Sequence, residues 1–295
     1  MNKINLTRNL AAFAISTLLF SCGGDSDSSS QEINLVDTTE SSIDGNLEDL
    51  FDSPEFDYQL PSPLQVASIF KNSGLAYNAG ATSDPGNEDS YTDELKQMLN
   101  FGVYSADMAY CVLNDQSNEA RKYLEVITDL AERIGMEAVF ENKDLMDRFD
   151  KNIGDKDSIE ILMLDIHERT EIYMDENDMQ HQQAVHFAGA WTEGMYLGVY
   201  DFEHSTDKDD VGAKIAEQMS ILQNIIKGLK DPKNEGMDLA WIVNDMTKIQ
   251  ETFDSFQSVI DYFNDPTADE LYLTKKEYDT LGALVKDLRN KIIMP

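Results

Sequence analysis

The stretch "GVYSADMAY", residues 102–110, is followed 87 residues later by "GAWTEGMYL", residues 189–197. A glycine, an aromatic residue, a hydroxyl residue and a methionine stand at the same four places in both stretches. Small residues recur at helical spacing, at Gly102, Ala106 and Ala109 and again at Gly194 and Gly198. A glycine inside a helix costs about 1 kcal/mol relative to alanine, so it usually marks close packing. The two stretches therefore predict two helices that lie deep in one core.

Each stretch begins a pair of expected helices, one over Glu94–Gly135 and the other over Gln180–Leu229. In both pairs the helix that carries the quoted stretch comes first, and an amphipathic helix follows it. The similarity predicts two pseudo-repeated helix pairs that pack against each other. The match can result from a duplication, or from coincidence between two helices with similar structural roles. The sequence leaves both explanations open.

Helical periodicity continues from Pro61 to the end of the chain, without sustained alternation of period two. The sequence therefore predicts an all-α domain over residues 61–295, a multi-helix bundle of eight or nine helices. The expected boundaries are N-caps at Ser62, Thr92 and Ser158, a helix from Ser117 that stops at Gly135, helices over about 144–149, 180–200 and 211–229, the longest helix over 237–263, and a capping box at Thr274–Glu277.

The first 22 residues have the pattern of a bacterial lipoprotein signal. Lys3 and Arg8 precede an apolar segment from Ala11 to Phe20, which is too short to span a bilayer as a helix. The segment ends in Ser21-Cys22, which resembles the lipobox, where lipid is attached to the cysteine. We expect residues 1–21 to be removed and acyl chains on Cys22 to anchor the protein to a membrane. An ordinary signal peptide with a chance cysteine is the alternative.

Residues 22–60 contain eleven acidic residues and no lysine or arginine, with serines and glycines between them. Such a segment cannot bury enough apolar surface to fold alone, so the sequence predicts a disordered acidic tether. The formal charge of the chain is −33, and loss of Lys3 and Arg8 with the signal would make it −35. A field of this sign repels nucleic acid, which we exclude as a partner. The expected location is the cell envelope, at the outer membrane.

The polar residues inside the paired stretches are the candidates for a functional site. Asp107 and Glu193 stand among apolar and small neighbours, where an unpaired charge would be very costly. One interpretation is that each is a core carboxylate held by a tyrosine hydroxyl, a backbone amide or an arginine such as Arg121, Arg148 or Arg169. The other is a pocket for a small molecule or a peptide, lined by Tyr104, Asp107, Tyr110, His186, Trp191, Glu193 and Tyr196.

The stretches at residues 99–110 ("LNFGVYSADMAY"), 152–159 ("NIGDKDSI") and 187–198 ("FAGAWTEGMYLG") resemble a family of Bacteroidetes lipoproteins and secreted proteins of uncharacterised function. The resemblance extends from about Pro61 to Tyr200, and methionine replaces the usual leucine at positions 108 and 195. It implies a helical fold but no activity. The family pattern falls on Gly102, Tyr104, Asp107, Tyr110, Trp191, Glu193, Gly194 and Tyr196.

Other chemistry has weaker support in the sequence. His167-Glu168-x-x-Glu171 lacks the second histidine of a zinc-protease motif, and Asp207–Gly212 lacks the glutamate of a calcium loop. We therefore expect no metal and no cofactor. Cys111 has apolar neighbours, which favours an inert buried thiol. The expected function is an anchored, non-enzymatic domain that binds an envelope protein or a small molecule, or serves as a scaffold. The alternative is an envelope hydrolase or lyase that uses Asp107 and Glu193 as acid and base.

Overall fold

Among the helices that the structure describes, the two that carry the paired stretches bury the largest share of their residues. The computed structural model describes residues 77–140, 144–204, 209–265, 267–268 and 270–294, all within one compact unit. Helix α2 spans Glu94–Leu113 and buries fifteen of its twenty residues. Helix α7 spans Gln180–His204 and buries seventeen of its 25. This confirms that both stretches are helical and lie in the core.

The described residues form helices and connecting segments without any strand, which confirms the all-α class. Ten α-helices are present in this part of the chain, and nine of them have seven residues or more. The expected signal peptide, the tether and the helix after Ser62 lie outside the described residues. The remaining elements are α3 (Ser117–Arg133), α4 (Glu137–Phe140), α5 (Asp144–Lys151), α6 (Lys156–Glu176), α8 (Asp209–Leu229), α9 (Ala240–Asp254), α10 (Gln257–Asn264), α11 (Lys275–Ile293) and the 3-10 turns η2 (Pro85–Ser90) and η3 (Pro232–Asn234).

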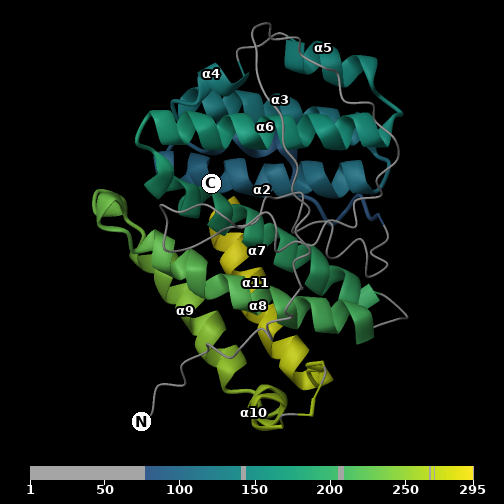
Figure 1. Ribbon diagram of the computed structural model, residues 1–295, viewed down its shortest axis with the longest axis vertical. Helices are drawn as coiled ribbons and strands as arrows, with labels where there is room; N and C mark the ends of the chain where they lie inside the picture. The colour runs from purple at the N-terminus through teal and green to yellow at the C-terminus, as the bar shows by residue number, and fades with distance from the viewer. Residues whose placement is uncertain (1–76, 141–143, 205–208, 266, 269, 295) are drawn as a thin grey trace, which may run out of the picture. The chain divides into compact units, whose positions relative to one another are not determined.

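The helices pack in the order α3, α2, α7, α8, so the two expected pairs meet through their first helices (Figure 1). Helix α11 packs on α7 and α9 and also reaches α2, while α9 contacts α8. Helix α6 lies against α2, α4, α5 and α7. The two stretches therefore form the central contact of the bundle, and α11 packs against both of their helices.

Two glycines allow α2 and α7 to touch backbone to backbone. A β-carbon on Gly102 would lie 1.9 Å from the carbonyl oxygen of His186, and one on Gly189 would lie 1.9 Å from that of Leu99. His186 precedes Gly189 by three residues, and Leu99 precedes Gly102 by three. The contact is therefore reciprocal, as a local two-fold axis between the helices would make it. Gly189 supplies this contact on the second helix, where the sequence pattern had indicated Gly194 and Gly198.

Two helix N-caps differ from the expected ones. The side chain of Asp93, rather than Thr92, caps α2, and that of Asp155, rather than Ser158, caps α6. In both places an aspartate stands where it can accept a hydrogen bond from the backbone N–H three residues later. The capping box at Thr274 and Glu277 is confirmed.

The helix expected over residues 237–263 is two helices, α9 and α10, and the longest helix is α7 instead. The chain turns at Phe256, whose backbone is extended with φ −65° and ψ 138°. Phe253, Phe256 and Val259 are all buried around this turn. Their regular spacing by three residues resembles continuous helix, which is why the sequence pattern concealed the break.

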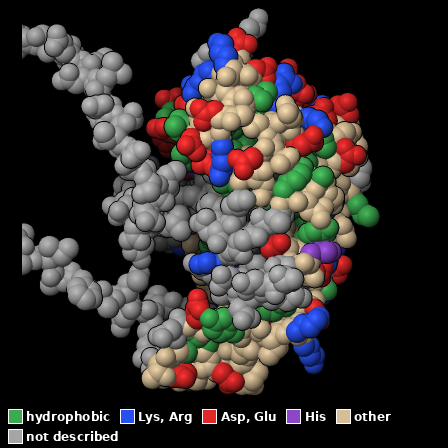
Figure 2. Space-filling model, turned by 90° about the vertical axis from the view of Figure 1, so that its right-hand side faces the viewer, with side chains coloured by type: hydrophobic (Ala, Val, Ile, Leu, Met, Phe, Trp, Pro, Cys, Tyr) green, Lys and Arg blue, Asp and Glu red, His purple; other side chains and the backbone are tan. Residues whose placement is uncertain are grey.

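Acidic side chains are spread over the face drawn in Figure 2, with lysine and arginine side chains among them. Exposed ion pairs among the described residues include Arg121 with Asp150 and Lys286 with Glu203. Exposed pairs of this kind contribute little to stability. None of the described helices is long and apolar enough to cross a membrane.

Candidate functional site

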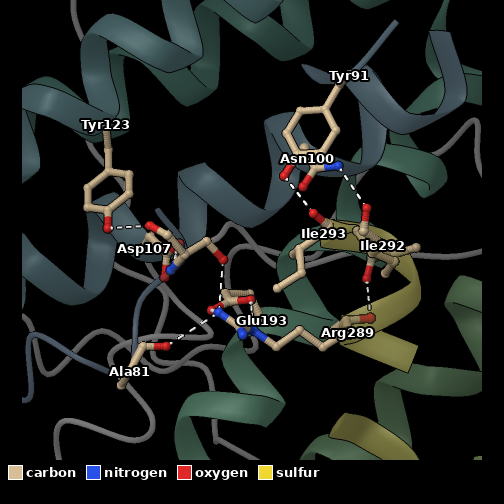
Figure 3. Close-up of polar contacts among 12 residues, drawn as sticks. Ala81, Tyr91, Asn100, Asp107, Tyr123, Glu193, Arg289, Ile292 and Ile293 are labelled. Carbon is tan, nitrogen blue, oxygen red and sulfur yellow. Dashed lines mark hydrogen bonds and ion pairs between the residues drawn. The ribbon is translucent and has the colours of Figure 1, made fainter. Parts of the chain in front are cut away.

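The two candidate carboxylates, Asp107 on α2 and Glu193 on α7, lie side by side around one arginine from α11 (Figure 3). Arg289 Nε donates to Glu193 Oε2 over 2.6 Å, and its Nη2 donates to Oε1 over 2.8 Å. Both carboxylate side chains are fully buried, and Arg289 is only 7% exposed. A bidentate pair in such surroundings is a strong, directional contact, and it fixes α11 to α7.

A segment before α2 completes this cluster. The Ser83 N–H donates to Asp107 Oδ2 over 3.0 Å, and Arg289 Nη2 donates to Ser83 Oγ over 2.8 Å. The Tyr123 hydroxyl on α3 donates to the carbonyl oxygen of Ser83 over 2.9 Å. Four helices and one loop therefore meet at a few hydrogen-bonded side chains, which we call the Arg289 cluster: Ser83, Asp107, Tyr123, Glu193 and Arg289.

The pKa of Asp107 is shifted strongly by its place in the Arg289 cluster. Burial raises the pKa of its carboxyl well above the usual range, and Glu193 raises it further, whereas Arg289 and the Ser83 N–H act against these effects. Asp107 Oδ1 has no hydrogen-bond partner among the described residues. The surroundings of Asp107 therefore favour the neutral form of its carboxyl more than water does.

The stability of the Asp107→Asn variant, measured relative to that of the wild type, should increase as the pH rises. The unfolded aspartate ionises near pH 4, while the folded one keeps its proton to higher pH. Between the two pKa values the folded state binds more protons, so the free energy of unfolding of the wild type falls by up to about 1.4 kcal/mol per pH unit. Asparagine carries no such proton. Urea unfolding between about pH 4 and pH 7 measures the difference.

The control is Asp150→Asn, because Asp150 is exposed and its pKa is lowered by the hydrogen bond from Arg121. The contribution of the Asp150 ion pair to the free energy of unfolding is complete above the pKa of aspartate in the unfolded chain, and it is lost only below about pH 4. The difference between this variant and the wild type should therefore stay constant from about pH 5 to pH 7. A constant difference for Asp107→Asn over the same range would show that Asp107 is ionised in the folded protein.

The seven residues predicted to line one pocket lie in four different places. Asp107 and Glu193 belong to the Arg289 cluster, and the ring of Tyr196 lies 3.8 Å from the Arg289 guanidinium. The hydroxyl of Tyr104 donates to the carbonyl oxygen of Asp84 over 2.9 Å, and that of Tyr110 accepts from the Asn78 N–H over 2.6 Å. These two phenols hold the loop before α2.

Trp191 and His186 point away from the cluster. The Trp191 indole donates to the carbonyl oxygen of Gln218 on α8 over 3.2 Å. His186 lies beside Phe101, on the side of α7 that faces α6, with ring centroids 5.1 Å apart. Helix α2 crosses α7 at Gly189, which lies between His186 and Glu193 in the sequence. The side chains of His186 and Glu193 share one face of α7, but α2 separates them.

The arginine that pairs with the buried carboxylate is not one of the three that the sequence suggested. Arg121, Arg148 and Arg169 form ion pairs with aspartates near the surface. Arg289 was missed, although its position carries a signal. It interrupts the buried face of α11 that contains Leu281, Val285, Leu288 and Ile292. A lone charge at such a position needs a buried partner of opposite sign.

Of the remaining motifs, Asp207–Gly212 lies outside the residues whose side chains are described. No group of three or more metal-ligating side chains occurs among the residues that the structure describes. His167 Nε2 lies 3.5 Å from Glu171 Oε1, one turn along the same helix. Cys111 is buried, and burial raises the pKa of its thiol.

In comparisons with known proteins, the chain matches no family model, no curated protein and no solved structure. The resemblance to Bacteroidetes lipoproteins therefore stays a prediction that rests on the quoted stretches.

Proposed function

We propose that this protein is a lipid-anchored, non-catalytic binding protein of the cell envelope, and that the Arg289 cluster shapes its helical domain. The observation that carries the proposal is the complete burial of Asp107 and Glu193, one of them paired with Arg289 and the other held by Ser83. Acid–base catalysis requires both groups to reach a substrate. Buried and bonded in this way, the two carboxyls join α2, α7 and α11.

The alternative, a hydrolase or lyase that uses the same two carboxyls, has one observation in its favour. The two groups are neighbours, and their environments push the pKa of Asp107 upward, as in enzymes that work with a carboxyl pair. Against it, both side chains are fully buried, with Arg289 bonded to Glu193 and the Ser83 N–H bonded to Asp107. The pair therefore supports a structural role better than a catalytic one.

The proposed anchor rests on the N-terminal sequence, with its positive start, its short apolar segment and Cys22. Acyl chains at Cys22 would bind the membrane, and the acidic residues up to position 60 would keep the helical domain away from it. The outer membrane is the location that we propose. Cell fractionation tests this directly, because Cys22→Ser should move the protein from the membrane fraction to the soluble fraction.

A ligand screen by thermal shift tests binding against catalysis, with the wild type and Asp107→Asn side by side. Asparagine preserves the shape of Asp107 and its hydrogen bond from Ser83 but cannot transfer a proton. We expect compounds that raise the melting temperature of the wild type to raise that of the variant equally. A folded variant that has lost the response to such a compound would place Asp107 in the ligand site and favour the enzyme.

A further inference from the structure

Helix α6 covers α2 only loosely. It buries just three of its 21 residues, Ile159, Leu162 and Met174, whereas α2 buries three quarters of its own. On the outer side of α6, Ile161 is 63% exposed and Ile172 is 51% exposed. The inner side does not close completely on its neighbours, and two adjoining cavities lie beneath it.

The first cavity, of about 80 Å³, lies between α6, α2, α3 and α4, and the second, of about 60 Å³, lies between α6, α2 and α7. Both are lined by Phe101, Ser105, His167 and Thr170, so they form one groove, which we call the α6 groove. The first cavity is otherwise apolar, with Met108, Leu124, Ile127, Phe140, Met163, Leu164 and Ile166 in its wall.

The polar groups that line the groove are mostly engaged. The Ser105 and Thr170 hydroxyls donate to carbonyl oxygens of their own helices, over 2.7 and 2.8 Å. Glu171 accepts from Gln183 and lies near His167 at the edge, where the Glu171 side chain is 47% exposed. The groove is thus polar at its margin and apolar inside.

His186 is the exception. It lines the second cavity, is only 7% exposed, and neither ring nitrogen has a hydrogen-bond partner among the described residues. An unsatisfied buried polar group costs about 1–3 kcal/mol, so such a group in a native fold needs an explanation. Burial lowers the pKa of this imidazole to about 3, which makes it neutral at physiological pH. A neutral imidazole offers one donor and one acceptor.

We propose that the α6 groove binds an uncharged, mainly hydrocarbon molecule with a single hydroxyl group, which hydrogen-bonds to His186. The proposal rests on the binding function proposed above and names its site and ligand class. A hydroxyl both donates and accepts, as the imidazole does. An anionic head would meet Glu171 at the edge and no cation inside, and a cationic head would lose its hydration among apolar side chains.

The size of the groove suggests a probe. A water molecule needs about 10–15 Å³ of such space, so the two cavities together hold on the order of ten atoms of ligand. 1-Octanol fits this size, and octanoate and octylammonium carry the same chain with a negative or a positive head. Binding is measured on the chain from residue 22 with Cys22→Ser, so that no attached lipid competes.

Methionine methyl groups report where each probe binds. Met108 and Met163 line the first cavity and Met174 the second, while Met246 is buried on α9 outside both. In spectra of protein labelled at the methionine methyl carbons, 1-octanol should shift the three lining residues and leave Met246 unchanged. Octanoate and octylammonium should bind at least tenfold more weakly.

Substitutions then separate the groove from the rest of the surface. Thr170→Phe fills the junction of the two cavities and should abolish the shifts, whereas Ile161→Phe adds a similar side chain on the exposed side of α6 and should preserve them. His186→Leu should weaken 1-octanol about fivefold, the value of one hydrogen bond, and His186→Gln should restore part of the loss.

Each contrary result overturns a distinct part of the proposal. Equal binding to Thr170→Phe and the wild type, or no shift at the lining methionines, would rule out the groove and leave the general binding function standing. Tighter binding of either charged probe would rule out the ligand class. Binding seen only after residues 23–76 are deleted would assign the groove to the protein's own chain.

Discussion

Gly102→Ala and Gly189→Ala should each lower the free energy of unfolding by about 4 kcal/mol or more, near the limit of what a small domain tolerates. The new β-carbon would stand 1.9 Å from a backbone carbonyl oxygen of the opposite helix. Real contacts of this kind need more than 3 Å, so α2 and α7 would have to separate by over an ångström. The backbone of a helix cannot change rotamer as a side chain can, so the whole contact between α2 and α7 would loosen.

Two other glycines provide graded controls. A β-carbon on Gly282 would lie 2.8 Å from a methyl group of Val199, which can rotate, and one on Gly236 would meet nothing within 4 Å. Urea unfolding should therefore give a smaller loss for Gly282→Ala and a change below about 1 kcal/mol for Gly236→Ala. If Gly102→Ala and Gly236→Ala unfolded at the same urea concentration, the close crossing of α2 and α7 would have to be abandoned.

The reciprocal crossing explains how much of the fold the sequence could indicate. Helical periodicity and glycines inside apolar helices are local signals, and both follow from packing that each helix must satisfy along its whole length. They were enough to place α2 and α7 in the core. Which glycine touches the partner depends on where the two helices cross, and no local pattern contains that. Gly189 was therefore overlooked in favour of Gly194 and Gly198.

The candidate site shows the same limit more sharply. Asp107 and Glu193 were recognisable as buried because their neighbours are apolar, but their partner Arg289 is 96 residues beyond Glu193. Only the folded chain brings α11 beside α7. His186 was grouped with Glu193 as a polar residue among aromatic ones, and the two are seven residues, about two helical turns, apart. The position of α2, which crosses α7 between these two residues, cannot be inferred from spacing. Because of this crossing, His186 lies in a different part of the molecule from Glu193.

Breaking the Arg289 cluster from the arginine side should give the other large effect. Arg289→Met leaves Glu193 fully buried without its cation, and removing one partner of a buried ion pair typically costs about 3–5 kcal/mol. The loss should be greatest at neutral pH and smaller near pH 5. A buried carboxylate without a cation takes up a proton more readily, so the folded variant binds more protons than the unfolded one as the pH falls.

Lys286→Met is the matched control for this loss, because Lys286 precedes Arg289 by one turn of α11 and also pairs with a glutamate of α7. Its Nζ lies 2.6 Å from Glu203 Oε1, but the two side chains are 35% and 40% exposed, so solvent screens the pair and its removal should change stability by less than about 1 kcal/mol. Adding Glu193→Gln to Arg289→Met should recover part of the lost stability, since it removes the buried charge that has no cation beside it. Equal losses for the two single variants would mean that solvent reaches Glu193. The buried pair would then be no obstacle to catalysis, and the enzyme alternative would regain its two carboxyls.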